Sequence, residues 1–270
     1  MTYKQQKGMT IMKSRVIYLK NVLAFLAVGV VIAAAVAIYA TKTIPDLTTA
    51  SATQRLIPIY NVDYAEKKAS LSFDAAWGNE DTQMLIDILG QYDVKATFFI
   101  VGQWVDKYPE SVKALSDAGH EIMNHSDTHP HMAQLSREQI LQEINSCNQK
   151  IQNITGVCPT LLRAPYGEYN NTLIETLDSI NMKCIQWDVD SLDWKDNATP
   201  DSICKSVTSR VQNGSIVLFH NDAEHTPEAL PDILKCLKDE GYEFVFINDL
   251  ILKENYEINH MGMQCKIKND

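Results

Sequence analysis

A repeating alternation of two kinds of segment runs through residues 57–250 and restricts the fold more than any other feature. Short apolar runs rich in β-branched and aromatic residues alternate with longer stretches whose apolar residues recur at helical spacing. The short runs predict strands at Ala69–Phe73, Ala96–Val101, Glu121–Met123, Thr160–Arg163, Lys183–Trp187, Ser215–Phe219 and Glu243–Ile247. Strands that alternate with helices indicate an α/β fold with a parallel sheet. Periodicity alone allows both an open doubly wound sheet and a closed barrel.

Capping and proline signals predict where several of the intervening helices begin. Ser136 followed by Gln139 forms a capping box, which opens a helix running toward Ile154. Thr199 and Thr226 each precede a proline, which predicts a capping residue followed by proline at the first helical position. Further helices are expected over residues 81–91, 109–118 and 171–179.

The first forty residues differ in character from the rest of the chain. Asn21–Ala40 is uncharged, and twenty helical residues span about 30 Å, the thickness of a bilayer core. Only basic charges precede it, so we expect a cytoplasmic tail at 1–20, a single-pass transmembrane anchor at 21–40 and an extracellular remainder. A cleaved signal peptide, with a cleavage site near Ala35–Ala37, is the alternative and would give a secreted protein. Residues 41–56 are expected to form a linker, and residues 57–270 a single domain.

Charge and cysteine content narrow the classes of partner. The chain has 24 basic and 34 acidic residues, and without the five basic residues of the first forty the net charge falls from −10 to −15. A domain this acidic has no electrostatic reason to bind nucleic acid or anionic lipid, so a neutral glycan suits it better. The cysteines show no C-x-x-C spacing, which argues against a thiolate zinc site, and they could form three disulfides or remain free thiols. They are Cys147, Cys158, Cys184, Cys204, Cys236 and Cys265.

Most of the predicted strands run into residues that can bind metals or transfer protons. In parallel α/β folds the carboxyl ends of the strands share one edge, where active sites lie. Each of these residues taken alone could have a structural role, as a helix cap, a member of an ion pair or a histidine in the core. Because several of them are expected at one edge of the sheet, a functional site is favoured. His125 and His129 have the spacing of two imidazoles on one helical turn, although Pro130 indicates a loop. The full set is Asp74, His125, His129, Arg163, Asp188, Asp190, Asp193 and His220.

These residues lie in motifs that resemble those of the polysaccharide deacetylase family, the carbohydrate esterases with a NodB-like domain. The resemblance covers residues 66–252 and implies a distorted (β/α) barrel with residues 57–270 as its catalytic domain. It implies hydrolysis of N-acetyl groups on amino sugars of a cell-envelope polysaccharide such as peptidoglycan, with a divalent metal, usually zinc or cobalt. The SFD-x-x-WG variant resembles a subgroup linked to sporulation. The motifs are SFDAAWG at 72–78, HSDTH at 125–129, RAPYG at 163–167, DSLDW at 190–194 and VLFH at 217–220.

The resemblance also implies a role for the metal ligands and the proton-transfer groups. His125 and His129 would hold the metal, with Asp74 as a further candidate ligand. Two neutral imidazoles and an oxygen ligand suit zinc and leave positions open for water and the acetyl oxygen. Asp74 would act as the general base, and His220 as the general acid.

Four further residues receive supporting roles from the same resemblance. Arg163 would orient the catalytic base. Asp193 would orient the catalytic acid and keep it protonated near neutral pH. The backbone at Tyr166 would contribute to an oxyanion hole, and the rings of Tyr166 and Trp194 would offer faces for packing against sugar.

Ala75 departs from the family pattern, which has a second aspartate at this position as the third metal ligand. Three explanations remain open: Asp74 ligates the metal itself, a neighbour such as Asn79 or Glu80 replaces the missing carboxylate, or the metal binds weakly. The third explanation leads to an alternative function, a catalytically weak or inactive glycan-binding envelope protein. A barrel amidohydrolase acting on small molecules is a further alternative, which an exported domain disfavours.

Overall fold

The computed structural model describes residues 12, 18–20, 26–36, 39 and 54–267 of the chain. The chain divides into two units, residues 1–54 and 55–270. In the first unit, residues 18–20 and 26–36 are helical. No helix within the described residues is both long enough and apolar enough to span a membrane. Most of the expected basic tail and of the expected linker lies outside the described residues. The expected span Asn21–Ala40 lies partly outside them.

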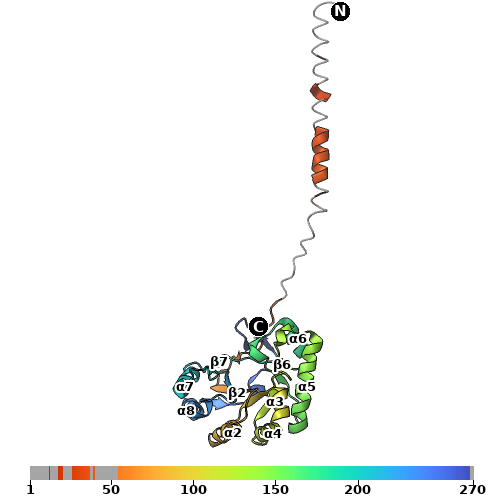
Figure 1. The fold of residues 1–270 in the computed structure, drawn as a ribbon. Coiled ribbons are helices and arrows are strands. Elements are labelled where there is room, and N and C mark those ends of the chain that lie inside the picture. The colour runs from red at the N-terminus through yellow and green to blue at the C-terminus, as the bar shows by residue number, and fades with distance from the viewer. Residues whose placement is uncertain (1–11, 13–17, 21–25, 37–38, 40–53, 268–270) are drawn as a thin grey trace, which may run out of the picture. The chain divides into compact units, whose positions relative to one another are not determined.

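The second unit is built on a parallel sheet with helices packed around it (Figure 1). All seven predicted strands are present, although β5, β6 and β9 are each only two residues long, shorter than predicted. Ile247, predicted as a strand residue, begins the short helix α9 (Ile247–Leu250). In the sheet, β2 lies between β8 and β3, and the order continues through β4 and β5 to β6. The strands are β2 (Lys68–Ala75), β3 (Thr97–Ile100), β4 (Glu121–Asn124), β5 (Leu161–Leu162), β6 (Lys183–Cys184), β8 (Ser215–His220) and β9 (Glu243–Phe244).

The sheet curls so that its two sides approach each other. The strand β7 (Val189–Asp190) follows β6 on the same stretch of chain and pairs in parallel with β8. Between β6 and β7, Ile185 forms an isolated bridge with Ile59. Residues 183–190 therefore pair with β5 at their start and with β8 at their end. The result is a curled half-barrel of the α/β class, in keeping with the expected distorted (β/α) barrel.

Besides β7, three short strands on the other side of β8 from β2 were not anticipated from the sequence. They are β1 (Asn61–Val62), β10 (Tyr256–Ile258) and β11 (Met263–Lys266). The strand β1 pairs antiparallel with β8 and parallel with β11, and β10 completes a hairpin with β11. Segments this short carry too few residues to show an alternating apolar pattern.

The helices begin where the capping signals predicted, with one change of role. The helix α5 starts after Ser136, and both hydrogen bonds of the capping box with Gln139 are present. The helix α8 starts at Thr226, but its cap position is His225, and the Thr226 hydroxyl instead donates to Asp193 at 2.8 Å. The capping role predicted for Thr226 is therefore wrong. The longer helices are α2 (Thr82–Gln91), α3 (Gly102–Lys107), α4 (Pro109–Asp117), α5 (Arg137–Thr155), α6 (Asn171–Ser179), α7 (Pro200–Thr208) and α8 (Thr226–Asp239).

An aromatic stack fixes the central strands relative to one another. The Phe73 ring of β2 stacks on Phe98 of β3 at 4.8 Å and on Phe219 of β8 at 5.3 Å between ring centroids. All three rings are buried in the core between sheet and helices. Because side chains alternate along a strand, Ser72 and Asp74 point to the opposite side of β2. The stack thus holds in place the strand ends that carry Asp74 and its neighbours.

All six cysteines lie within residues 54–267 and are free thiols. Of the two possibilities that the sequence left open, three disulfides or free thiols, the structure has free thiols.

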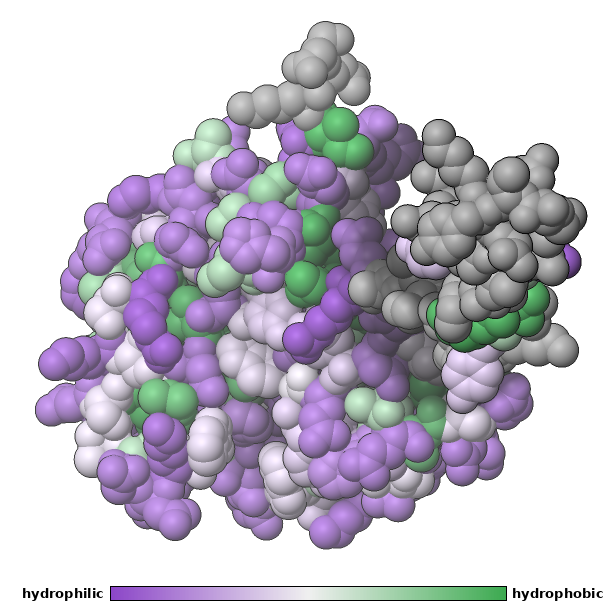
Figure 2. All heavy atoms as spheres, turned by 90° about the horizontal axis from the view of Figure 1, so that it is seen from above, coloured by the Kyte–Doolittle hydropathy of each residue, from purple (hydrophilic) through white to green (hydrophobic). Residues whose placement is uncertain are grey.

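The face of the molecule seen in Figure 2 is mostly hydrophilic, with hydrophobic residues in small separate patches.

Candidate active site

A cleft of about 640 Å³ lies where the parallel strands end. Most of the residues predicted from the motifs line it: Asp74, His125, His129, Tyr166, Trp194 and His220. The two predicted orienting residues, Arg163 and Asp193, lie directly behind it and contact Asp74 and His220 respectively. The sequence therefore predicted the location of the site, because the carboxyl ends of the strands meet there.

Asp74 and Arg163 form a buried ion pair beneath the cleft. The Arg163 side chain is fully buried, and its Nη1 donates to Asp74 Oδ1 at 2.8 Å. Its Nη2 donates to Ser72 Oγ at 2.8 Å and to the Gln186 carbonyl at 3.2 Å, and the guanidinium lies 4.2 Å from the centre of the Phe99 ring. A buried charge needs such partners to offset its desolvation.

The ion pair keeps Asp74 ionised. Burial alone would raise the pKa of Asp74, but the charge of Arg163, together with His125 and His220, outweighs burial and lowers that pKa. Arg163 occupies Oδ1, whereas Oδ2 faces His125 Nε2 at 3.6 Å. Asp74 therefore presents one carboxylate oxygen to the cleft.

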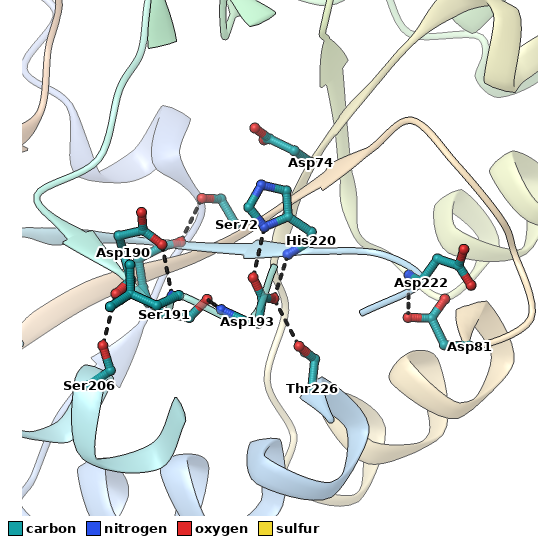
Figure 3. Close-up of polar contacts among 12 residues, drawn as sticks. Ser72, Asp74, Asp81, Asp190, Ser191, Asp193, Ser206, His220, Asp222 and Thr226 are labelled. Atoms are coloured by element: carbon teal, nitrogen blue, oxygen red, sulfur yellow. Dashed lines mark hydrogen bonds and ion pairs between the residues drawn. The ribbon is translucent and has the colours of Figure 1, made fainter. Parts of the chain in front are cut away.

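Asp193 and His220 form the second buried pair, shown in Figure 3 with the His220 ring lying between Asp74 and Asp193. Asp193 Oδ1 lies 2.8 Å from His220 Nδ1. Asp193 Oδ2 accepts hydrogen bonds from the His220 amide and the Thr226 hydroxyl, both at 2.8 Å. Burial lowers the pKa of His220, but the hydrogen bond and charge of Asp193 outweigh burial and raise it. Asp193 therefore favours the protonated form of His220, whose Nε2 is not used by Asp193.

His125 and His129 form a pair of neutral imidazoles. His125 Nδ1 lies 2.7 Å from the Arg163 carbonyl, so Nδ1 carries the proton and Nε2 keeps its lone pair. Burial lowers the pKa of both rings, that of His129 to about 4. The ring centroids are 5.1 Å apart. The segment between them is a loop and not a helical turn, as Pro130 indicated.

The donor set fits a divalent metal through these two imidazoles and the free Oδ2 of Asp74. Lone pairs on neutral imidazoles and a carboxylate oxygen are the ligands that zinc prefers. The donors are not drawn together into a ligand cluster, because the described residues contain no group of three His, Cys, Asp or Glu side chains close enough to hold a metal.

The position of the missing ligand is not refilled by its neighbours. Ala75 is 1% exposed and packs in the apolar core. The Asn79 side chain donates to Ser111 of α4 at 2.9 Å, and Glu80 accepts from the Asn79 amide at 2.9 Å. Neither side chain lines the cleft. The suggestion that Asn79 or Glu80 replaces the carboxylate is therefore wrong.

The loops around the cleft contain backbone conformations that side chains rarely adopt. Tyr166 has φ +61° and His129 has φ +59°. Residues held in the left-handed region cost about 1–3 kcal/mol each, and such strain clusters at functional sites. The residues with positive φ in these loops are Ser126, His129, Tyr166, Leu192 and Asp222.

The rims of the cleft carry aromatic rings, one of which was missed by the sequence analysis. Tyr166 and Trp194, both predicted to contact sugar, are 58% and 56% exposed. Trp77 lines the same cleft, is 56% exposed and lies 5.9 Å from the His129 ring. The signal was present in the sequence, because Trp77 stands in the motif that directly follows the strand ending near Asp74.

Comparisons with known proteins agree with this geometry. The family described as Polysaccharide deacetylase matches residues 61–185. The peptidoglycan-N-acetylglucosamine deacetylase of Bacillus cereus is 32% identical over 67% of this chain and 67% of its own length. The peptidoglycan-N-acetylmuramic acid deacetylase PdaC of Bacillus subtilis is 35% identical over 70% of this chain, which spans only 40% of PdaC.

A solved structure adds a relative without activity. BA3943 of Bacillus anthracis, described as a CE4 family pseudoenzyme, has a TM-score of 0.69 and 35% identity, covering 72% of this chain and 68% of BA3943. A mutant of BA3943 is described as having restored enzymatic activity. The sequence similarity, the curled α/β fold and the arrangement of the cleft residues lead to one conclusion: this chain belongs to the polysaccharide deacetylase family.

Proposed function

We propose that this protein removes N-acetyl groups from amino sugars of peptidoglycan. The observation that carries the proposal is the pairing of Asp74 with His220. They are register partners on the adjacent parallel strands β2 and β8. Their pKa values are shifted in opposite directions, downward for Asp74 and upward for His220. Two titratable groups whose surroundings push their pKa values apart are suited to act as base and acid.

The pair supplies the two proton transfers that amide hydrolysis needs. Asp74 Oδ2 accepts a proton from the attacking water, whose oxygen bonds to the acetyl carbon. His220 then donates a proton to the sugar nitrogen as the carbon–nitrogen bond breaks, so that acetate and a free amine leave. Arg163 holds the base in place, and Asp193 holds the acid protonated and oriented. The backbone at Tyr166 is our candidate donor for the developing oxyanion.

His125 and His129 would hold a divalent metal, zinc or cobalt. If Asp74 Oδ2 were also a ligand, it could not act as the base, and activation of the water would pass to the metal. When bound, such a metal polarises the acetyl carbonyl and lowers the pKa of its water. The tautomer of His125 suits this role, because its protonated Nδ1 donates to a backbone carbonyl and leaves Nε2 free.

Peptidoglycan is the proposed substrate because two relatives are named for it. Those names differ in the sugar, N-acetylmuramic acid in one and N-acetylglucosamine in the other. Peptidoglycan lies outside the cytoplasmic membrane, so the proposal requires export of the domain. The predicted anchor at residues 21–40 stays a prediction.

The test is acetate release by the purified full chain from N-acetylglucosamine oligomers and from peptidoglycan. The protein would be stripped with a chelator and assayed with and without added zinc or cobalt. We expect metal-dependent release that falls by about 10²–10⁴-fold in both Asp74→Asn and His220→Ala, the usual contribution of a general base or acid. Met261→Ala, an exposed residue outside the cleft lining, is the control. Equal rates in the Asp74→Asn variant and the parent would refute the proposal.

The second candidate function is glycan binding with little or no catalysis. Ala75 favours it, because the position of the third ligand carries no donor. The existence of a pseudoenzyme with 35% identity in the same fold also favours it. This alternative predicts that the metal-loaded protein binds glycan without releasing acetate.

A further inference from the structure

Trp77 combines exposure with proximity to the reacting groups. Its indole is 56% exposed and lines the cleft. The ring centroid lies 5.9 Å from that of His129 and 6.4 Å from that of His220. A large apolar ring beside polar catalytic groups has no role in the proton transfers described above, and exposed apolar surface of this kind often marks a binding site.

The loop that carries Trp77 is held on both sides of the indole. Asn221 is 4% exposed, accepts from the Ala76 amide at 3.1 Å through Oδ1 and donates to the Gly78 carbonyl through Nδ2. The Gly78 carbonyl also accepts from Trp104 Nε1 at 2.9 Å. The Gly78 amide donates to Asp222 Oδ2 at 3.2 Å. Asn221 directly follows His220, so the indole is tied to the strand end that bears the proposed acid.

Gly78 lets this loop lie close to two acidic side chains. A Cβ at this position would lie 2.6 Å from the Asp222 carboxylate and 2.3 Å from Glu80 Oε2. The loop therefore packs closely against the residues that follow β8. An exposed ring on a fixed backbone loses little freedom when a ligand packs on it, which favours binding.

The ligand chemistry follows from the shape and position of the ring. In β-linked pyranoses the axial C–H groups form an apolar face about the size of an indole, while the polar groups point outward around the ring edge. Aromatic side chains use their flat apolar surface and low entropy cost to bind such faces. The Tyr166 ring also lies near His129, 4.7 Å between centroids, so His129 has two aromatic neighbours.

We propose that Trp77 is the platform on which a β-linked N-acetylhexosamine unit packs, and that it thereby sets the position of the sugar relative to His220. This inference rests on the proposed function for the choice of ligand. Trp77 is a positioning and specificity residue, and Asn221 holds its loop.

The test measures glycan binding separately from acetate release. The full chain, kept metal-free with a chelator, would be titrated with a β-1,4-linked tetramer of N-acetylglucosamine in a calorimeter. We expect Trp77→Ala to weaken binding about tenfold or more, and Trp77→Phe to retain binding within about threefold, because a flat ring remains. Met261→Ala, which removes a 70% exposed side chain outside the cleft lining, should bind as the parent does.

Each outcome bears on the proposal. Unchanged affinity in Trp77→Ala, or no binding of the tetramer by the parent protein, would overturn it. Equal loss in Trp77→Ala and Trp77→Phe would overturn the packing role of the ring. If the binding results hold but no acetate is released with any metal, the Trp77 platform stands and the proposed catalytic function fails. If the protein is active, Trp77→Ala should raise KM for the tetramer, whereas Met261→Ala should leave KM as in the parent.

Discussion

The cleft has two halves, an acid side around His220 and a proposed metal side around His125 and His129. They differ in how many of the required contacts the protein's own side chains supply. On the acid side, Asp193 is 5% exposed and uses both oxygens in hydrogen bonds to the His220 ring, the His220 amide and Thr226. On the metal side, His125 and His129 are neutral rings, and Ala75 offers no donor between them and the strand end. Asp74 belongs to both halves, since Oδ1 binds Arg163 and Oδ2 faces His125.

The difference predicts that the proposed proton transfer and the proposed metal binding can be separated by mutation. The acid side is assembled by hydrogen bonds between side chains and backbone, so it forms on folding. The proposed metal side has only His125 and His129 as certain donors. Its affinity for a metal ion would therefore depend on whether Asp74 also coordinates the ion. Variants on one side should therefore leave the measurements on the other side nearly unchanged.

The largest expected effect comes from Asp193→Asn on the acid side. The carboxylate raises the pKa of His220 above its usual 6.5, so the acid stays protonated to higher pH and activity falls as pH rises through that raised pKa. Without the charge, we expect kcat to fall by about 10²–10⁴-fold and the loss of activity to begin at lower pH. The pH–rate profile measures this. An unshifted alkaline limb would show that His220 is not the acid.

A matched variant on the metal side is His129→Ala. We expect zinc affinity to fall by about 10–100-fold or more, the range seen when even supporting groups around a metal are lost. Calorimetric titration with zinc measures the affinity. The alkaline limb of any residual activity should remain in place, because Asp193 and His220 are untouched. A shift of that limb would contradict the separation of the two halves.

Ala75→Asp tests whether the metal side lacks only a donor. We expect zinc affinity to rise by about tenfold, since a carboxylate returns to the position that the family uses. The melting temperature of the metal-free protein should fall by about ten degrees, because an uncompensated charge buried in the apolar core costs about 3–5 kcal/mol. Zinc titration and thermal denaturation report the two effects. Unchanged zinc affinity would show that Asp74 already fills the ligand role.

The smallest effect is expected from Thr226→Val. This change removes one of the hydrogen bonds to Asp193 and keeps the shape of the side chain. We expect kcat to fall by about three- to tenfold, because the Asp193 carboxylate keeps its two hydrogen bonds to His220 and a net hydrogen bond contributes about 0.5–1.5 kcal/mol. An effect as large as that of Asp193→Asn would mean that Thr226 does more than support the carboxylate.

Several features could be predicted from the sequence because they depend on local pattern. The strands that carry Asp74, His125 and His220 were located by apolar runs, and the helix α5 by the capping box at Ser136. The gathering of these residues at one edge followed from the rule that parallel strands end together. The same local signal misassigned Thr226, whose hydroxyl bonds to a distant carboxylate.

Other features depended on contacts between residues far apart in the chain. Packing between separate elements decides three of them. It leaves the cysteines unpaired, keeps Asn79 and Glu80 out of the cleft lining, and lets Asn221 hold the loop of Trp77.

The sequence by itself determined the fold class, the family and the identity of the residues that gather at the cleft. These are encoded by the types of residues and their spacing, which act over a few positions. Only the tertiary structure decided that the pKa of Asp74 is lowered and that of His220 raised, and that Asn79 and Glu80 lie outside the cleft lining. The physical reason is that pKa shifts and ligand geometry arise from burial and from charges brought together across the sheet, which no short stretch of sequence contains.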